Sequence, residues 1–242
     1  IEAGRYVVDS WWAVIFNPST IPRFLHMAMA SLLTTCFAIA GVSAWYLLKG
    51  RHLDIAKPCF SFVLGAAVLI APMQVFLGDI VGLKIYEYQP LKTAAIEGNW
   101  RTQKGAPLIL FAIPNSQQEK NYYEISIPKL ASLINTHHWD GKLLGLKSVP
   151  PSERPVVGAT FWMFRVMVGI GFLFLFVALF ALWRNWRGQL YSSNRFYRLC
   201  ILIAPLGFLS TIAGWMVAES GRQPWIVYNL INISQGASIV PF

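Results

Sequence analysis

Four ionisable side chains lie within or at the ends of long apolar stretches of this sequence. They are His26, Asp79, Arg165 and Glu219. An ionisable group inside an apolar span is costly, so each is a candidate functional residue. His26 and Met167 offer an imidazole and a thioether, a pair that ligates haem iron in electron-transfer cytochromes. A nearby arginine can neutralise a haem propionate, and the sequence has no CxxCH, so any haem would be held without covalent attachment.

Simpler structural roles exist for the same side chains. A lone histidine near a helix end is more often a hydrogen-bonding group at the membrane interface than a ligand, and Met167 could serve only in packing. Glu219 and Arg222 are three positions apart, so on a helix they could form an ion pair that anchors its end. Both interpretations stay open on these residues alone.

Two polar pairs lie in the long segment between the second and third apolar stretches. Lys92 and Glu97 would ordinarily be solvated surface residues there. His137 and His138 look like a metal motif, but adjacent side chains diverge on any regular element. We therefore do not expect a metal site at the two histidines.

The composition predicts a membrane protein whose helices position these residues. The chain is 55% hydrophobic and only 13% charged, whereas a soluble domain of 242 residues needs far more charge to keep its surface wet. A stretch of about 20 apolar residues crosses a hydrocarbon core of about 30 Å. Four stretches meet this length, roughly 24–48, 59–83, 157–183 and 199–218. Pro72 and Pro205 fall inside spans and could kink them.

The basic residues indicate how the spans are oriented. The net charge of +9 is spread over short loops rather than gathered with aromatic residues, so a nucleic-acid partner is not expected. Loops 49–58 and 184–198 are both basic, which predicts that they are cytoplasmic. The segment 84–156 and both termini then lie outside, and the four ionisable residues fall at one depth near that side.

The predicted fold class is an all-α integral membrane protein, with four transmembrane helices of a larger bundle and a long extracytoplasmic loop. A loop of this length commonly works as a lid or a binding element. The first 17 residues mix aromatic and charged side chains, which favours a helix lying at the outer interface. The predicted regions are an interfacial segment 1–22, a helix pair 23–83, the loop 84–156, a second helix pair 157–218 and an extracytoplasmic segment 219–242.

Several motifs of the chain resemble subunit I of cytochrome bd-type quinol oxidases. The most specific is GRQPW at 221–225 with Glu219 before it, and the next is LKTAAIE at 91–97. Further matching stretches are 23–26, 41–50, 77–79 and 164–167. Their order and spacing hold along nearly the whole chain.

The resemblance implies two sites for haem b. His26 and Met167 would be the axial ligands of the low-spin haem b that receives electrons from quinol, with Arg165 against that haem. Glu219 would be the axial ligand of the high-spin haem b. Trp215, one turn earlier, would be its electron-transfer neighbour on the same helix face.

The resemblance also assigns roles to polar residues outside the spans. Arg222 is expected to pair with a haem propionate. Lys92 and Glu97 match the family's quinol-binding residues, Lys92 as a hydrogen-bond donor to the quinone oxygen and Glu97 as a general base. The substrate would be ubiquinol or menaquinol, and the protons would be released outside.

The family uses quinol to reduce oxygen to water in the bacterial inner membrane. Its further cofactor is haem d or a third haem b. The expected partners are oxidase subunit II, a small single-helix subunit and membrane lipid. A haem b membrane cytochrome that does not reduce oxygen and a polytopic solute transporter remain alternatives, which a reduced-minus-oxidised spectrum would separate.

The sequence departs from the family's pattern at both ends. The family's N-terminal helices, with the histidine of the oxygen-reducing haem, have no counterpart here, and neither does the span after GRQPW. We therefore expect a central and C-terminal fragment that has no oxidase activity alone. Its loop resembles the short version found in the subfamily often called cyanide-insensitive oxidase.

Overall fold

The computed structural model describes residues 10–236, and its framework is a bundle of long helices. Within these residues, four helical stretches are long and apolar enough to cross a membrane. They are α2 (Thr20–Lys49), α3 (Leu53–Tyr88), α6 (Val157–Trp186) and the consecutive pair α7 (Asn194–Ile203) and α8 (Leu206–Ser220). The predicted fold class is confirmed, and each helical stretch extends beyond the predicted span at one or both ends.

Local sequence explains where the helices begin, end and break. Gly50 ends α2 in the left-handed region, with φ of 65°, and its N–H donates to Leu47 O. The Ser193 side chain accepts from the Phe196 N–H and caps α7. Pro205 separates α7 from α8 because a proline interrupts helical hydrogen bonding, whereas Pro72 stays inside a continuous α3.

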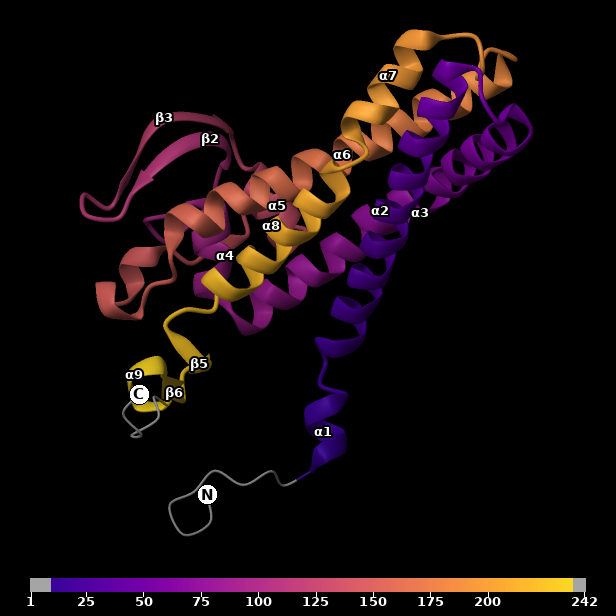
Figure 1. The fold of residues 1–242 in the computed structure, drawn as a ribbon. Coiled ribbons are helices and arrows are strands. Elements are labelled where there is room, and N and C mark those ends of the chain that lie inside the picture. Colours follow the sequence, from indigo (N-terminus) through magenta and orange to yellow (C-terminus); the bar gives the residue numbers. More distant parts are fainter. Residues whose placement is uncertain (1–9, 237–242) are drawn as a thin grey trace, which may run out of the picture.

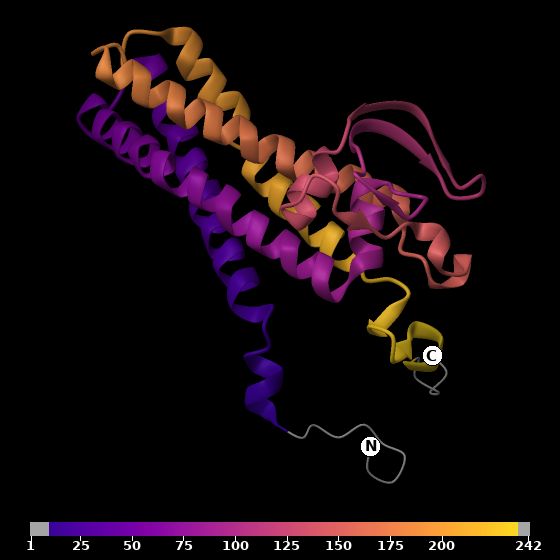
Figure 2. The ribbon, with the colours of Figure 1, turned by 180° about the vertical axis from the view of Figure 1, so that it is seen from behind.

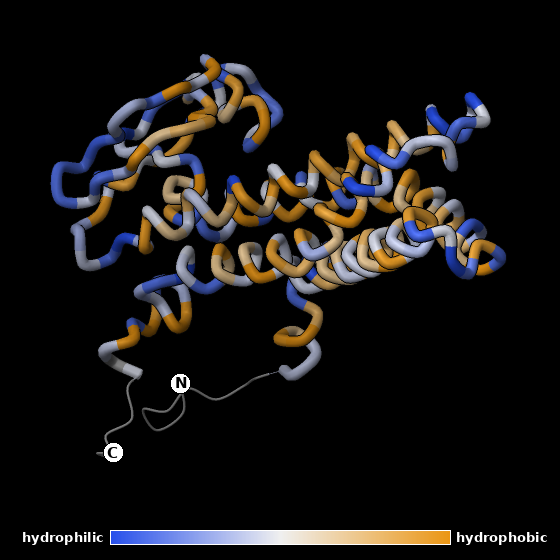
Figure 3. Tube along the Cα trace, turned by 45° about the horizontal axis from the view of Figure 1, so that its top comes forward, coloured by the Kyte–Doolittle hydropathy of each residue, from blue (hydrophilic) through white to orange (hydrophobic). Residues whose placement is uncertain are grey.

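The spans lie side by side as an elongated bundle, and the extramembrane elements gather at one end (Figures 1 and 2). The bundle core is apolar and aromatic. Phe37 of α2 stacks on Phe174 of α6 with ring centroids 3.9 Å apart. Hydrophobic positions follow the helices, while hydrophilic positions concentrate at the helix connections and in the extramembrane part (Figure 3).

The segment between α3 and α6 folds into short elements rather than an irregular loop. In order they are α4 (Pro90–Glu97), β1 (Gln103–Lys104), β2 (Leu108–Asn115), β3 (Lys120–Ile127), α5 (Leu130–Thr136), β4 (Lys142–Leu143), η1 (Leu146–Ser148) and η2 (Pro151–Glu153). β2 and β3 form an antiparallel hairpin, and β1 pairs antiparallel with β4. These strands are an addition to the all-helical prediction and are confined to the extramembrane part among residues 84–156.

Both ends of the described chain carry short elements outside the bundle. The N-terminal one is α1 (Trp11–Ile15), whose residues are all exposed. The predicted interfacial helix at 1–17 is therefore described only in part, because residues 1–9 lie outside the described range. After α8 come β5 (Trp225–Val227), β6 (Ile231–Asn232) and α9 (Ile233–Gly236).

Candidate functional site

α4 is a short helix outside the spans that is buried like a core element. Pro90 stands at its first turn, and Gly98 ends it with φ of 72°. Every residue from 91 to 100 is buried, including Lys92 and Glu97. The solvated-surface interpretation of this pair is therefore wrong, because α4 packs between the ends of α3 and α6.

Lys92 extends from α4 to the end of α8. Its Nζ donates to the Ala218 carbonyl oxygen at 3.1 Å. A Cβ on Gly221 would lie 2.9 Å from the Lys92 stem, so only glycine leaves room for the side chain. Burial and the positive charge of Arg23 lower the pKa of Lys92 to about 8, while Glu219 acts in the opposite direction.

Glu97 points to a different neighbour, the helix α5. Its Oε1 accepts from Asn135 Nδ2 at 2.9 Å. Its Oε2 is buried, and no residue between 10 and 236 donates to it. Burial raises the pKa of Glu97, and the Asn135 hydrogen bond and the Arg165 charge offset part of this rise. Lys92 thus contacts the end of α8, whereas Glu97 contacts α5.

Arg165 joins the third span to the extramembrane segment. Its guanidinium donates to the carbonyl oxygens of Ile96 at 2.8 Å, Phe161 at 2.9 Å and Ile109 at 3.0 Å. It also lies over the Phe161 ring, 3.3 Å from the centroid. Arg165 therefore holds α4 and β2 against α6, and its expected position against a haem stays a prediction.

His26 and Met167, the expected haem ligands, contact different helices. Gln74 Nε2 lies 3.3 Å from His26 Nε2, while His26 Nδ1 is buried and has no partner in the described part of the chain. Met167 lies against α8, where a Cβ on Gly214 would be 2.9 Å from its sulfur. A Cβ on Gly78 would likewise be 3.3 Å from His26 Cε1.

This donor set fits a b-type haem. A ligating histidine needs one ring nitrogen for the metal and usually has a hydrogen bond at the other. In His26 one nitrogen, Nε2, lies near Gln74, and the other, Nδ1, has no partner in the described part of the chain. Gly78 and Gly214 give these two side chains their room, because a Cβ at either glycine would crowd one of them. The fit concerns the chemistry of the two groups, and their roles as ligands stay predictions.

Glu219 and Arg222 form the ion pair that their spacing allowed. Both side chains are about half exposed in the described residues, and Trp215, one turn before Glu219, is 65% exposed. The expected ion pair is confirmed, and it leaves the haem roles of these two residues untested. Haem ligation by Glu219, propionate pairing by Arg222 and electron transfer through Trp215 stay predictions.

A family model for cytochrome bd terminal oxidase subunit I matches residues 1–242, the whole chain. The chain belongs to the cytochrome bd terminal oxidase subunit I family. Cytochrome bd ubiquinol oxidase subunit 1 of Bacillus subtilis is 34% identical over 98% of this chain and 53% of its own length. Cytochrome bd-II ubiquinol oxidase subunit 1 of Escherichia coli is 28% identical over 96% of this chain and 58% of its own length.

The fold also matches a solved cytochrome bd oxidase. The bd oxidase from Geobacillus thermodenitrificans superimposes with a TM-score of 0.83 and 31% sequence identity, covering 94% of this chain and 52% of that one. The present chain thus spans about half the length of the cytochrome bd relatives that it matches. It is an integral membrane protein of this family.

Asp79, to which the sequence assigned no role, contacts the loop. In this cytochrome bd family chain its Oδ2 lies 3.2 Å from Nε2 of His137, which follows α5. The contact connects the C-terminal part of α3 with the end of α5, the helix that also carries Asn135. His137 thus has a protein partner on a neighbouring span.

Two side chains beside the proposed site were missed by sequence reasoning. Gln74 could have been found, because an amide inside an apolar span needs a partner. Asn135 has no such signal, since it lies in a polar segment 38 positions from its partner Glu97. Only the packing of α5 on the site makes it relevant.

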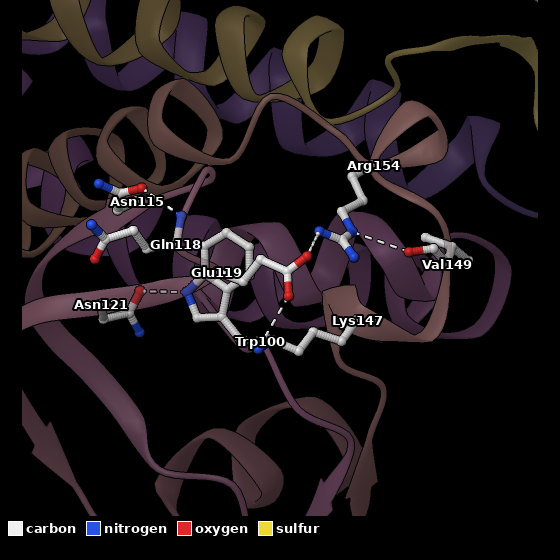
Figure 4. A network of polar contacts seen from close by, with 8 residues as sticks. All are labelled: Trp100, Asn115, Gln118, Glu119, Asn121, Lys147, Val149 and Arg154. Atoms are coloured by element: carbon white, nitrogen blue, oxygen red, sulfur yellow. Dashed lines mark hydrogen bonds and ion pairs between the residues drawn. The ribbon is translucent and has the colours of Figure 1, made fainter.

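A polar network holds the turn of the β2–β3 hairpin (Figure 4). Glu119 pairs with Arg154 at 2.7 Å and with Lys147 at 3.1 Å. Beside it, Trp100 Nε1 donates to Asn121 Oδ1 at 2.8 Å. The hairpin is thereby fixed to the residues that follow α4 and to those that lead into α6.

Proposed function

We propose that this chain is the quinol-oxidising, haem-binding part of a terminal oxidase in the bacterial inner membrane. Its electrons would pass from membrane quinol through haems b to oxygen, and its loop would face the outer side. The family membership and the buried pair on α4 support this function. Oxygen reduction would require the remainder of the longer protein, with haem d or a third haem b, and oxidase subunit II with a small single-helix subunit.

The observation that carries the proposal is the chemistry of α4. Oxidation of a quinol releases two electrons and two protons. A buried carboxylate with one unpartnered oxygen, as at Glu97, can take a proton from a quinol hydroxyl. Lys92 donates to one carbonyl oxygen, and its ammonium has further protons to donate to a quinone oxygen.

Residues of the spans supply the binding groups for the haems. His26 and Met167 would hold the low-spin haem b, with Gln74 orienting the histidine ring. Glu219 would hold the high-spin haem b, and Arg222 would neutralise a propionate. When bound, such haems carry single electrons away from quinol.

Replacement of Glu97 tests the quinol site. In the complete oxidase complex, Glu97→Gln keeps the Asn135 contact but removes the base, so quinol oxidation should fall by roughly 10²–10⁴-fold with haem spectra unchanged. Glu124→Gln, on an exposed carboxylate of β3, is the matched control and should retain activity. Full activity of Glu97→Gln would refute the proposed base.

Replacement of the haem ligands tests the electron-transfer site. His26→Ala and Met167→Leu should each abolish the low-spin signal in a reduced-minus-oxidised spectrum of the complex. Survival of that signal in both variants would make the ligand assignment wrong. Oxygen consumption by the unmodified complex then separates an oxidase from a cytochrome that only transfers electrons.

A further inference from the structure

Three buried polar oxygens lie on α4 and at its N-cap, at intervals of four positions. They are Oε1 of Gln89, Oγ1 of Thr93 and Oε2 of Glu97, and none has a hydrogen-bond partner within residues 10–236. Thr93 and Glu97 are four apart on α4 and lie on one helix face, and Gln89 is the N-cap residue four positions before Thr93. We refer to these three side chains as the row. Gln89 and Thr93 are uncharged, and neither has a role in the quinol chemistry described above.

Such a row is costly unless something satisfies it. Each buried polar atom without a hydrogen bond costs about 1–3 kcal/mol, and native proteins pair nearly all of them with protein or ordered water. Thr93 and Glu97 are each only 3% exposed. On α4, the Cβ atoms of Thr93 and Glu97 are about 5–6 Å apart, and one bridging water spans a similar distance with two hydrogen bonds.

The row also has a direction. Glu97 is at its deep end, facing Arg165 of α6 and Asn135 of α5. Gln89 is at the other end and follows Tyr88, which is 46% exposed. The row therefore leads from the buried carboxylate towards solvent at the end of α3.

We propose that Thr93 and Gln89, with bridging waters, form the exit path for the proton that Glu97 accepts. This inference rests on the proposed function. On oxidation to the quinone, a quinol would give its two electrons to the haems b and release one proton from each hydroxyl. Glu97 would take one of these protons and return it to water beside Thr93, while the other proton passes from the second hydroxyl directly to water. The proton from Glu97 then leaves past Gln89, and the carboxylate is restored for the next quinol. Thr93 and Gln89 are positioning residues, since neither bonds to the quinol.

The raised pKa of Glu97 suits this role, because a carboxyl that holds a proton more tightly than usual needs a path to release it. Lys92 shares α4 but extends to the end of α8, so it does not belong to the row. The charged group that faces Glu97 from a span is Arg165, whose positive charge favours release of the proton.

Isosteric replacement of Thr93 in the complete oxidase complex tests the path. Thr93→Val keeps the shape but removes the hydroxyl, and we expect kcat for quinol oxidation to fall about tenfold, less than loss of the base itself. KM and the haem spectra should be unchanged, and the solvent deuterium isotope effect on kcat should increase. Thr93→Ser keeps the hydroxyl and should restore kcat and the isotope effect.

Different results would overturn the inference in distinct ways. A rise in KM with kcat unchanged would mean that the row contacts the quinol, and a Thr93→Val enzyme with the unmodified kcat and isotope effect would mean that no proton passes there. Failure of Thr93→Ser to restore kcat would mean that the fall of kcat in Thr93→Val comes from altered packing. Absence of quinol oxidation in the unmodified complex would instead overturn the proposed function itself.

Discussion

α4 and the β2–β3 hairpin belong to the same extramembrane segment but are held in opposite ways. α4 is buried along its length, and the spans contact it directly through Arg165 and through the bond from Lys92 to Ala218. Most residues of β3 are exposed. The hairpin is held by the ion pairs of Glu119 at its turn and by the edge-to-face contact of Phe111 with Trp162, with centroids 5.2 Å apart. Arg165 also donates to Ile109 O of β2.

The difference explains how a loop can carry a precise site. Functional groups must be held within a fraction of an ångström, which loops rarely achieve without support. Here the bundle supports the whole of α4 through buried contacts, while in the hairpin it holds β2 and leaves β3 mostly exposed. We therefore expect perturbations of α4 to reduce both its order and quinol oxidation, and perturbations of the hairpin to change local order alone.

Removal of Arg165 should have the largest effect. Arg165→Leu leaves the carbonyls of Ile96 and Ile109 without this donor, and each charge-assisted bond contributes about 1.5–3 kcal/mol. The segment 84–156 should become sensitive to trypsin in membranes, and quinol oxidation should be lost. Arg187→Leu, at the opposite end of α6, is the control and should keep the protection of the unmodified protein. Equal protection in Arg165→Leu would contradict the comparison.

The next largest effect should come from Gly98. It has φ of 72°, and an added Cβ would lie 2.9 Å from the buried Phe161 ring. Gly98→Ala combines about 1–2 kcal/mol for the left-handed backbone with about 1–3 kcal/mol for overpacking. It should lower both the thermal midpoint and the rate of quinol oxidation.

Gly105→Ala is the matched control for this change. Gly105 also has a positive φ, of 62°, but an added Cβ there would make only ordinary contacts, the nearest at 3.4 Å. Its thermal midpoint should fall by the backbone contribution alone, with quinol oxidation retained. Equal losses in both variants would mean that the close packing at Gly98 is unimportant.

Hydropathy predicted the bundle well, whereas the site was predicted only from sequence motifs. The spans are long apolar runs, so their existence follows from length and composition. Burial of Lys92 and Glu97 did not follow from local sequence, because it results from packing α4 on distant helices. The hairpin was missed because its exposed strand lacks a regular buried face, and Asn135 was missed because its partner is distant in sequence.

The pH dependence of α4 should be smaller than the effect of Gly98→Ala, because Asn135 and Arg165 offset part of the burial of Glu97. Its raised pKa means that folded Glu97 retains its proton at pH values where the unfolded chain, with a pKa near 4.5, has lost it. The free energy of unfolding therefore falls as the pH rises from about 4.5 through the folded pKa. Hydrogen exchange of amides 90–100, corrected for intrinsic rates, should quicken over this window, and Glu97→Gln should remove the change. Exchange independent of pH in the unmodified protein would exclude it.

The hairpin should respond to pH with the opposite sign and the smallest amplitude. Hydrogen bonds from Arg154 and Lys147 lower the pKa of Glu119, so its stabilising contribution is present above pH 4.5 and is lost as the pH falls through the folded pKa. Acidification should therefore quicken exchange of amides 110–125 while it slows exchange in α4 of the same sample. Glu119→Gln should abolish the hairpin response and leave quinol oxidation unchanged. High salt should weaken the Glu119–Lys147 contact of the unmodified hairpin, because a partly exposed ion pair is screened. If both regions slowed or quickened together on acidification, the two halves of the segment would share one opening equilibrium, and the separate docking of α4 would be wrong.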